Sequence, residues 1–267
     1  MPTTLRPPVG LKTLRRLSRR RSARVEAGCF VVEGALSVSA ALDGGFELVE
    51  AFVEPGASPG DVASLRAAGV AVTELDPGRL QGIVSTTTPQ PVAAVVVAPA
   101  LRATDLDPTM AEMLLVLVDV GDPGNVGTLL RVAEGAGVSA VLCVGESADP
   151  FSPKSVRASA GSVFSVGVVV DKEAEATVRS LVDAGWTVTA TSPRASVVYD
   201  QVDLTGPSAF VLGSEAHGLR AEIEDLVGRS VRIPMSGRAE SLNVAMAGAV
   251  LCFESQRQRR AASTPDG

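Results

Sequence analysis

The sequence predicts an α/β protein with a mainly parallel β-sheet in its C-terminal part, preceded by a smaller α/β domain. Short apolar segments of strand length alternate there with segments of helical periodicity, which is the pattern of a parallel sheet. Several of these apolar segments end in loops rich in glycine and polar residues. The length of 267 residues suffices for two domains, each with its own core.

The N-terminal domain is predicted to span residues 1–98. Its apolar pattern indicates a helix over 10–22, a strand over 29–33, a helix over 34–43, a strand over 47–53, a helix over 59–68, and strands over 70–74 and 92–97. Residues 99–108 contain Pro, Asp and Thr without apolar periodicity. We therefore expect a linker there.

The C-terminal domain is predicted to span residues 109–260, and residues 261–267 are predicted to form a disordered tail. Its strands are expected near 113–120, 139–144, 165–170, 186–190, 209–212 and 230–233, with helices between them. Because all connections between these strands pass through helices, the sheet is expected to be mainly parallel.

A first candidate site follows the apolar run 113–120. Gly121 to Gly124 is turn-forming sequence, and Asn125 is predicted to cap a helix ending near Gly135 or Gly137. Arg131 lies one turn after Gly127 and would lean back toward the loop, where a phosphate or ribose could bind. The alternative is a solvated helix residue. No Gly-Lys-Ser/Thr or Gly-x-Gly-x-x-Gly is present, which argues against a P-loop or a dinucleotide fold.

Two further segments have the same organisation. The apolar run from Phe210 leads into a loop with two glycines and Glu215, and a strand ending at Ile233 is closed by Pro234. Ser241 is predicted to cap the helix that follows. In open α/β sheets, ligands bind at the carboxyl ends of the strands. All three segments place their polar residues there, which predicts one shared ligand site.

Together these segments resemble the SpoU (TrmH) family of RNA ribose 2′-O-methyltransferases, within the SPOUT class. The resemblance covers about residues 110–255 and rests on Asn125-x-Gly127-x-x-x-Arg131, Gly213-Ser214-Glu215-x-x-Gly218-Leu219, Ile233-Pro234-Met235 and Ser241-Leu242-Asn243-Val244-Ala245. In addition, Phe30–Gly34 and Thr86–Ala93 resemble the family's N-terminal substrate-binding domain.

The resemblance implies a deep trefoil knot, a homodimer, and S-adenosylmethionine held mostly by backbone groups of three loops. The residues that it assigns to the cofactor are Thr191, Leu212, Gly213, Ser214, Gly218, Ile233, Met235 and Leu242. Those that it assigns to catalysis are Asn125, Arg131, Glu215, Ser241 and Asn243. Leu242, Met246 and Phe253 fit either the dimer interface or the core.

The implied reaction moves a methyl group from a sulfonium to a ribose 2′-hydroxyl, whose proton must leave during attack. Arginine stays protonated in proteins, so Arg131 is expected to act as a cation rather than as a base. It would fix the adjacent phosphate and stabilise developing negative charge, while the phosphate or water takes the proton.

Basic residues indicate where RNA would bind. The net charge is −6, yet the first 25 residues are strongly basic and contain no acid. The predicted RNA-binding residues are Arg15, Arg16, Arg19, Arg20, Lys154 and Arg157. The alternatives are a disordered arm for the first four and solvated surface cations for the last two. Because aromatic residues are few, we expect recognition of the backbone and shape of a folded RNA.

The composition favours a cytoplasmic enzyme without a metal. No apolar run could span a bilayer. Cys29, Cys143 and Cys252 are scattered, which favours buried thiols in a reducing compartment over a disulfide framework or a zinc site. His217 is the only histidine, so a multi-histidine metal site is excluded, and a loop position is expected for it.

The leading hypothesis is S-adenosylmethionine-dependent methylation of a ribose 2′-hydroxyl in 23S ribosomal RNA, with resistance to a ribosome-binding antibiotic as one biological role left open. One alternative is a transfer-RNA 2′-O-methyltransferase. Another is a non-catalytic RNA-binding or ribosome-assembly protein, for which loss of cofactor binding would be the mark. A Rossmann enzyme using a dinucleotide is disfavoured by its missing fingerprint.

Overall fold

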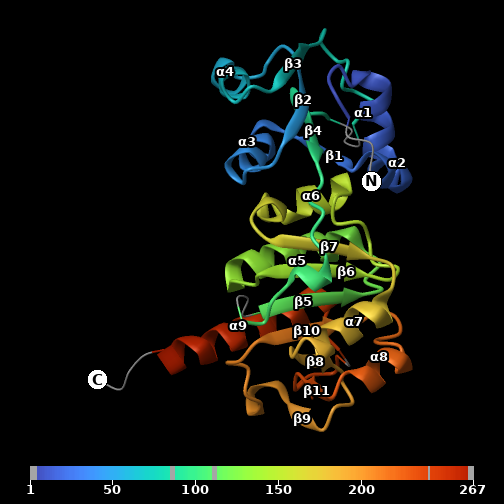
Figure 1. Ribbon diagram of the computed structural model, residues 1–267, viewed down its shortest axis with the longest axis vertical. Helices are drawn as coiled ribbons and strands as arrows, with labels where there is room; N and C mark the ends of the chain where they lie inside the picture. Colours follow the sequence, from blue (N-terminus) through green and yellow to red (C-terminus); the bar gives the residue numbers. More distant parts are fainter. Residues whose placement is uncertain (1–4, 85–87, 110–112, 240, 264–267) are drawn as a thin grey trace. The chain divides into compact units, whose positions relative to one another are not determined.

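The computed structural model describes residues 5–84, 88–109, 113–239 and 241–263 (Figure 1). The chain forms two compact units. The first comprises residues 1–99 together with 151–165, and the second comprises residues 100–150 together with 166–267. Residues 151–165, which lie within the predicted C-terminal domain of 109–260, pack with the first unit.

The first unit contains a four-stranded sheet flanked by helices. Its strands are β1 (Cys29–Glu33), β2 (Leu48–Val53), β3 (Ala71–Glu74) and β4 (Val92–Val97), in the order β1-β4-β2-β3. Strand β4 is antiparallel to β1 and to β2, whereas β2 and β3 are parallel. The helices of residues 5–84 are α1 (Gly10–Arg19), α2 (Arg21–Ala27), α3 (Ala35–Asp43) and α4 (Pro59–Ala67).

The helix predicted over 10–22 is two helices in the structure. Arg20 is extended between them, with φ −124° and ψ 119°. The break lets each helix bury one side: Leu14 and Leu17 of α1 and Ala23 of α2 lie in the same core cluster. A single helical period across the break could not present all three residues to one surface.

Aromatic packing explains why residues 151–165 belong to the first unit. This segment contains α6 (Pro153–Ser159) and the short 3₁₀ helix η2 (Ser162–Phe164). The ring of Phe151 lies 4.8 Å from that of Phe30, and the ring of Phe164 lies 5.2 Å from that of Phe46, edge to face. Phe30, Phe151 and Phe164 are buried, so this cluster is part of the core of the first unit.

The second unit contains a seven-stranded sheet in which every pair of neighbours is parallel, as predicted. Its order is β7-β6-β5-β10-β8-β11-β9. The strands are β5 (Met113–Val118), β6 (Ala140–Val144), β7 (Gly167–Asp171), β8 (Thr187–Thr191), β9 (Val197–Val198), β10 (Ser208–Leu212) and β11 (Arg229–Arg232). The sequence pattern missed β9, whose two residues are too few for a periodic signal.

Helices cover both faces of this sheet (Figure 1). On one face, α7 (Ala174–Asp183) and α8 (Ala221–Leu226) pack against a cluster that includes Leu114, Val116 and Val211. On the other face lie α5 (Pro123–Ala136) and α9 (Val244–Ser263), which pack against each other. Burial on both faces explains why the central strands read as continuous apolar runs.

Two predicted boundary segments differ in the structure. The predicted linker contains the short 3₁₀ helix η1 (Ala103–Asp105), and Leu101 and Leu106 pack against the core of the second unit. Helix α9 continues to Ser263, into the predicted tail, whereas residues 264–267 lie outside the described residues. The knot implied by the resemblance stays a prediction. Within the described residues, no helix is both long enough and apolar enough to cross a membrane.

Candidate functional site

The candidate site lies at the carboxyl edge of the seven-stranded sheet. Strand β10 pairs with β5 on one side and with β8 on the other, and β8 also pairs with β11. Because these pairs are parallel, the loops that follow the four strands emerge along the same edge. The loop after β8 is joined to β11 directly, since Ser192 N donates to Val231 O at 3.0 Å.

A line of hydrogen bonds joins three of the sequence motifs. The Asn125 side-chain amide donates to Glu215 Oε1 at 2.7 Å, and the Asn243 amide donates to Asn125 Oδ1 at 3.1 Å. These bonds bridge sequence separations of 90 and 118 residues. The structure therefore brings together three of the five predicted catalytic residues: Asn125, Glu215 and Asn243.

The way in which α5 and α9 begin leaves the side-chain amides of Asn125 and Asn243 free to form these hydrogen bonds. Asp122 caps α5, because its side chain accepts from Gly124 N at 3.0 Å. Asn125 is therefore not the cap that the sequence predicted, and its amide can reach across to Glu215. At α9, Asn243 Oδ1 accepts from Ala245 N at 2.8 Å. Asn243 thus takes the capping place predicted for Ser241, which is exposed two residues earlier.

The loop that carries Glu215 is closed by its own backbone. Ser214 N donates to Gly218 O at 3.0 Å, and Gly218 N donates to Ser214 O at 2.8 Å. A Cβ at Gly213 would lie 2.4 Å from Gly218 C, so this position requires glycine. The bracing presents Glu215 to solvent at the tip of the loop, next to the exposed His217.

The residues predicted to bind the cofactor lie in the loops along this edge. Thr191 and Leu212 are the last residues of β8 and β10, and Ile233 follows β11 directly. Leu212 is buried, Ile233 and Leu242 are half-buried, and Met235 is exposed. Gly213, Ser214 and Gly218 form the braced loop described above. This edge thus offers backbone donors and acceptors next to apolar side chains.

Arg131 takes no part in the hydrogen-bond line. It is exposed on α5, and among the described residues it has no hydrogen-bond or ion-pair partner. The Asn125 side chain is instead hydrogen-bonded to Glu215 and Asn243. Glu240, between two of the motifs, lies outside the described residues.

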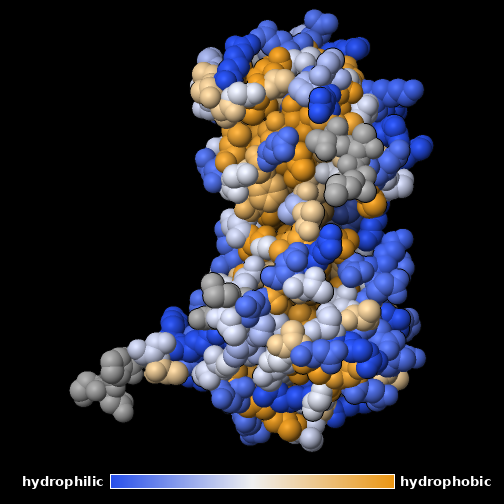
Figure 2. All heavy atoms as spheres, in the orientation of Figure 1, coloured by the Kyte–Doolittle hydropathy of each residue, from blue (hydrophilic) through white to orange (hydrophobic). Residues whose placement is uncertain are grey.

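The basic N-terminal residues form an ordered face rather than a disordered arm. Arg15, Arg16, Arg19 and Arg20 are all exposed. Arg16 pairs with Glu26 at 3.2 Å, and Arg19 donates to Gly82 O at 2.7 Å. Figure 2 shows hydrophilic residues along the outer side of these helices. Arg24, from the same basic run, is buried and donates to Leu17 O at 2.7 Å.

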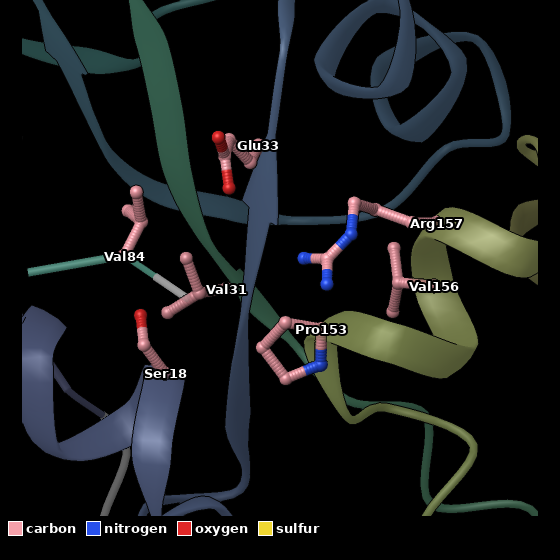
Figure 3. Close-up of a pocket in the computed structure, with 7 residues that line it drawn as sticks. All are labelled: Ser18, Val31, Glu33, Val84, Pro153, Val156 and Arg157. Carbon is pink, nitrogen blue, oxygen red and sulfur yellow. The ribbon is translucent and has the colours of Figure 1, made fainter. Parts of the chain in front are cut away.

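The second predicted RNA contact, on α6, borders a small pocket of the first unit (Figure 3). Arg157 points into this pocket toward Glu33 of β1, whereas Lys154 does not line it. Ser18 of α1 also points inward; it is 4% exposed, and its hydroxyl has no hydrogen-bond partner among the described residues. Both Lys154 and Arg157 are exposed.

Sequence reasoning missed a pair of charged residues beside the hydrogen-bond line. Asp119 directly follows β5, and its Oδ2 lies 3.1 Å from Arg220 Nε. Its backbone is left-handed, with φ 56°. The available signal was an aspartate immediately after a buried strand, since Asp is among the few residues that tolerate this conformation.

The three cysteines are buried, as predicted. Complete burial raises the pKa of the Cys252 thiol to about 12, because the interior disfavours the thiolate. Burial likewise raises the pKa of Cys29. Within the part of the chain that the structure describes, no cluster of three or more His, Cys, Asp or Glu side chains could hold a metal ion.

The chain is thus a two-unit α/β protein with a polar cluster at the carboxyl edge of a parallel sheet, where such proteins bind ligands. The family model of the SpoU rRNA Methylase family matches residues 112–253, and that of the MRM3-like substrate binding domain matches residues 10–94. The chain therefore belongs to the SpoU rRNA methylase family, as the sequence motifs indicated.

Three relatives illustrate the similarity. The chain is 30% identical to the 23S rRNA (guanosine(2553)-2′-O)-methyltransferase RlmP of Bacillus subtilis, over 87% of this chain and 90% of that protein. It is 37% identical to an uncharacterized tRNA/rRNA methyltransferase of Synechocystis, over 59% of this chain but 58% of that protein. The crystal structure of an AdoMet-bound rRNA methyltransferase from Sinorhizobium meliloti superimposes with a TM-score of 0.83 and 34% identity, covering 96% of each chain.

Proposed function

We propose that this protein transfers the methyl group of S-adenosylmethionine to a ribose 2′-hydroxyl of 23S ribosomal RNA. The hydrogen-bonded line Glu215–Asn125–Asn243 carries the proposal, because it assembles the family's polar motifs at the edge where α/β sheets bind ligands. RlmP of Bacillus subtilis, named for the same reaction on 23S rRNA, supports this substrate. We also propose a cytoplasmic location, where a ribosomal RNA substrate would be met.

The residues at the sheet edge fit S-adenosylmethionine. A nucleoside with an amino-acid tail needs backbone donors and acceptors beside apolar surface. The strand-end loops offer such backbone groups, and Leu212, Ile233 and Leu242 supply the apolar side chains. The structure of the S. meliloti relative is described as AdoMet bound, which supports this assignment. When bound, the cofactor supplies a methyl group on a positively charged sulfur.

Arg131 is proposed to bind the RNA phosphate next to the target ribose. Its guanidinium is exposed and has no partner within the described residues, so it can engage an RNA phosphate in a bidentate manner. A fixed cation there stabilises the negative charge that develops on the 2′-oxygen as its proton leaves to the phosphate or to water.

Glu215 is proposed to orient Arg131. Asn125 occupies Glu215 Oε1, which leaves the second carboxylate oxygen to accept from the guanidinium when RNA is bound. Asn243 fixes the Asn125 amide in turn, so the carboxylate is held from two helix starts. Ser241 is exposed two residues before Asn243, and we propose that it contacts the cofactor or the ribose.

The first unit is proposed to bind the RNA. Its exposed arginines Arg15, Arg16, Arg19 and Arg20 offer a basic face to phosphates, and Lys154 and Arg157 on α6 add two further cations. Recognition would use the backbone and shape of a folded RNA rather than stacking on aromatic rings. The match to a substrate-binding domain model over residues 10–94 supports this role.

A homodimer is part of the proposal. On α9, Met246 is 60% exposed and Phe253 is 45% exposed, so neither belongs to the core of the single chain. Their spacing of two helical turns places them on one side of α9. A second copy packing there would bury both side chains, and Leu242 lies two residues before the same helix.

The test is methyl transfer from radiolabelled S-adenosylmethionine to 23S rRNA, transfer RNA and intact large subunits. We expect label that survives alkaline hydrolysis as an uncleaved dinucleotide in 23S rRNA or the subunit. Arg131→Ala should lower the rate about 100-fold or more, as loss of a charge-stabilising donor does. The matched control Arg179→Ala removes an exposed arginine of α7, paired with Glu175, and should leave the rate unchanged.

Each contrary result points elsewhere. Label in transfer RNA alone would make this a transfer-RNA enzyme. Cofactor binding without transfer to any of the three RNAs would refute the ribosomal substrate. Absence of cofactor binding, measured by calorimetry, would favour a non-catalytic RNA-binding protein.

A further inference from the structure

Asp119 occupies a junction between three loops of the second unit. It follows β5 and begins the loop that leads to Asn125. Its Oδ1 accepts from Glu146 N at 2.8 Å, in the loop after β6. Its Oδ2 lies 3.1 Å from Arg220 Nε, at the end of the loop that carries Glu215. The Asp119 carboxylate, in the loop after β5, therefore contacts both the loop after β6 and the loop after β10.

The local backbone is built around this carboxylate. Asp119 has φ 56°, a left-handed conformation that costs most residues energy and that Asp, Asn and Gly adopt most readily. Opposite it, a Cβ at Gly145 would lie only 2.3 Å from Asp119 Oδ1. Gly145 also has a positive φ of 64°. Because Gly145 has no side chain, the Asp119 carboxylate can occupy the space next to it.

Further bonds tie the same two loops together. Val120 N donates to Ser147 Oγ at 3.1 Å, and Ala148 N donates to Val120 O at 2.9 Å. The loop after β5 is thus fixed to the loop after β6 independently of Asp119. By contrast, the Glu215 loop is held to the segment from the end of β5 to the start of α5 by side-chain contacts, Asn125 to Glu215 and Asp119 to Arg220.

We propose that Asp119 is a positioning residue for the Glu215 loop and acts through Arg220. The ion pair fixes the end of the loop at residue 220, while Asn125 holds its tip at Glu215. The Asp119 side chain is 24% exposed and that of Arg220 is 55% exposed, so the pair contributes little to global stability. The ion pair instead affects the orientation of the loop. With both Glu215 and Arg220 held, the loop has a defined orientation, whereas a single contact would let it rotate.

The proposal that Asp119 fixes the Glu215 loop does not depend on the proposed function. The expected effect of Asp119 on turnover does rest on the proposed function. The test compares Asp119→Asn, Arg220→Gln, the double variant and Arg220→Lys. Asn tolerates the left-handed backbone and still accepts from Glu146 N, so Asp119→Asn removes the ion pair and little else. Arg179→Gln on α7, which breaks an exposed ion pair with Glu175, is the matched control.

Three quantities are measured for each variant: hydrogen–deuterium exchange of residues 213–220, kcat of methyl transfer, and the thermal midpoint. We expect faster exchange in this loop and a kcat lowered about tenfold in Asp119→Asn and in Arg220→Gln, since displacement of a positioned group by ~1 Å can cost more than that. The double variant should be no worse than either single variant. Arg220→Lys should recover part of kcat, and the thermal midpoint should stay near that of the wild type.

The proposal is overturned by unchanged loop exchange in Asp119→Asn, by single-variant losses that multiply in the double variant, or by equal effects in Arg179→Gln. A kcat that falls only in step with the thermal midpoint would also overturn it. If the wild type methylates no RNA, the proposed function fails, whereas the exchange measurement still decides whether Asp119 holds the loop.

Discussion

Asn125 is the residue on which the site converges, because its one side chain both donates to Glu215 and accepts from Asn243. The sequence identified the residue through its motif but assigned its local role wrongly. Asp122 and Asn125 are both capping residue types within the same four positions. Which of the two caps helix α5 depends on the backbone geometry at the helix start, and the residue types alone do not determine that geometry.

Asn125→Ala tests the line directly. It leaves Glu215 without its donor and Asn243 without its acceptor, so we expect methyl transfer to fall about 10- to 100-fold, as for a misplaced catalytic group. The thermal midpoint should change little, because the bonds are exposed. Thr128→Ala is the control: it removes an exposed bond to Gly124 O on the same helix and should retain full activity.

Two buried serines offer a second comparison at this scale. Ser255 Oγ donates to Leu204 O at 2.8 Å, whereas Ser18 Oγ has no partner among the described residues. Ser255→Ala leaves a buried carbonyl unpaired and should cost about 1–3 kcal/mol of unfolding free energy. Ser18→Ala should cost less. Urea denaturation of both variants measures the difference, and an equal cost would contradict the assignment.

At the scale of elements, the packing of α9 on α5 and β10 depends on a glycine. A Cβ at Gly248 would lie 2.5 Å from Leu129 Cδ2 and 2.9 Å from Leu212 Cδ1. The sequence left open whether Met246 and Phe253 belong to the core or to a dimer interface. In the structure Ala245, Gly248, Leu251 and Cys252 form the buried side of α9, while Met246 and Phe253 are exposed.

Gly248→Ala and Gly135→Ala should have opposite effects. At Gly248 the new methyl group overpacks the interface, which should destabilise the protein by about 1–3 kcal/mol. At Gly135, on α5, it would meet Phe253 Cζ at an ordinary 3.6 Å, and the better helix propensity of alanine should stabilise by about 0.5–1 kcal/mol. Thermal denaturation of both variants checks the signs, and a loss at Gly135 would show that α9 approaches α5 more closely.

For the whole molecule, the sequence predicted the parallel sheet and the region of each strand longer than two residues. Apolar runs of strand length can be recognised in the local sequence alone. The placement of residues 151–165 could not be predicted, because it depends on contacts of Phe151 and Phe164 with rings more than 100 residues earlier. The Asp119–Arg220 pair was missed for the same reason.

The proposed homodimer makes a prediction at this scale. Met246→Lys places a charge on the exposed apolar side of α9, so it should shift the protein to the monomer at micromolar concentration. Because Met246 is exposed in the single chain, the fold should be retained. Light scattering coupled to size-exclusion chromatography measures the mass, and circular dichroism checks the fold. Val182→Lys, on α7, is the control, and a variant Met246→Lys that stays dimeric would place the interface elsewhere.

The aromatic cluster of the first unit has a consequence for synthesis of the chain. The ribosome releases Phe30 and Phe46 early, but their partners Phe151 and Phe164 follow only after β5, α5 and β6 have been made. At about 5–20 residues per second, that wait lasts several seconds or longer. The first unit therefore cannot complete its core until part of the second unit has been made, and the rings of Phe30 and Phe46 lack two of their partners during that time.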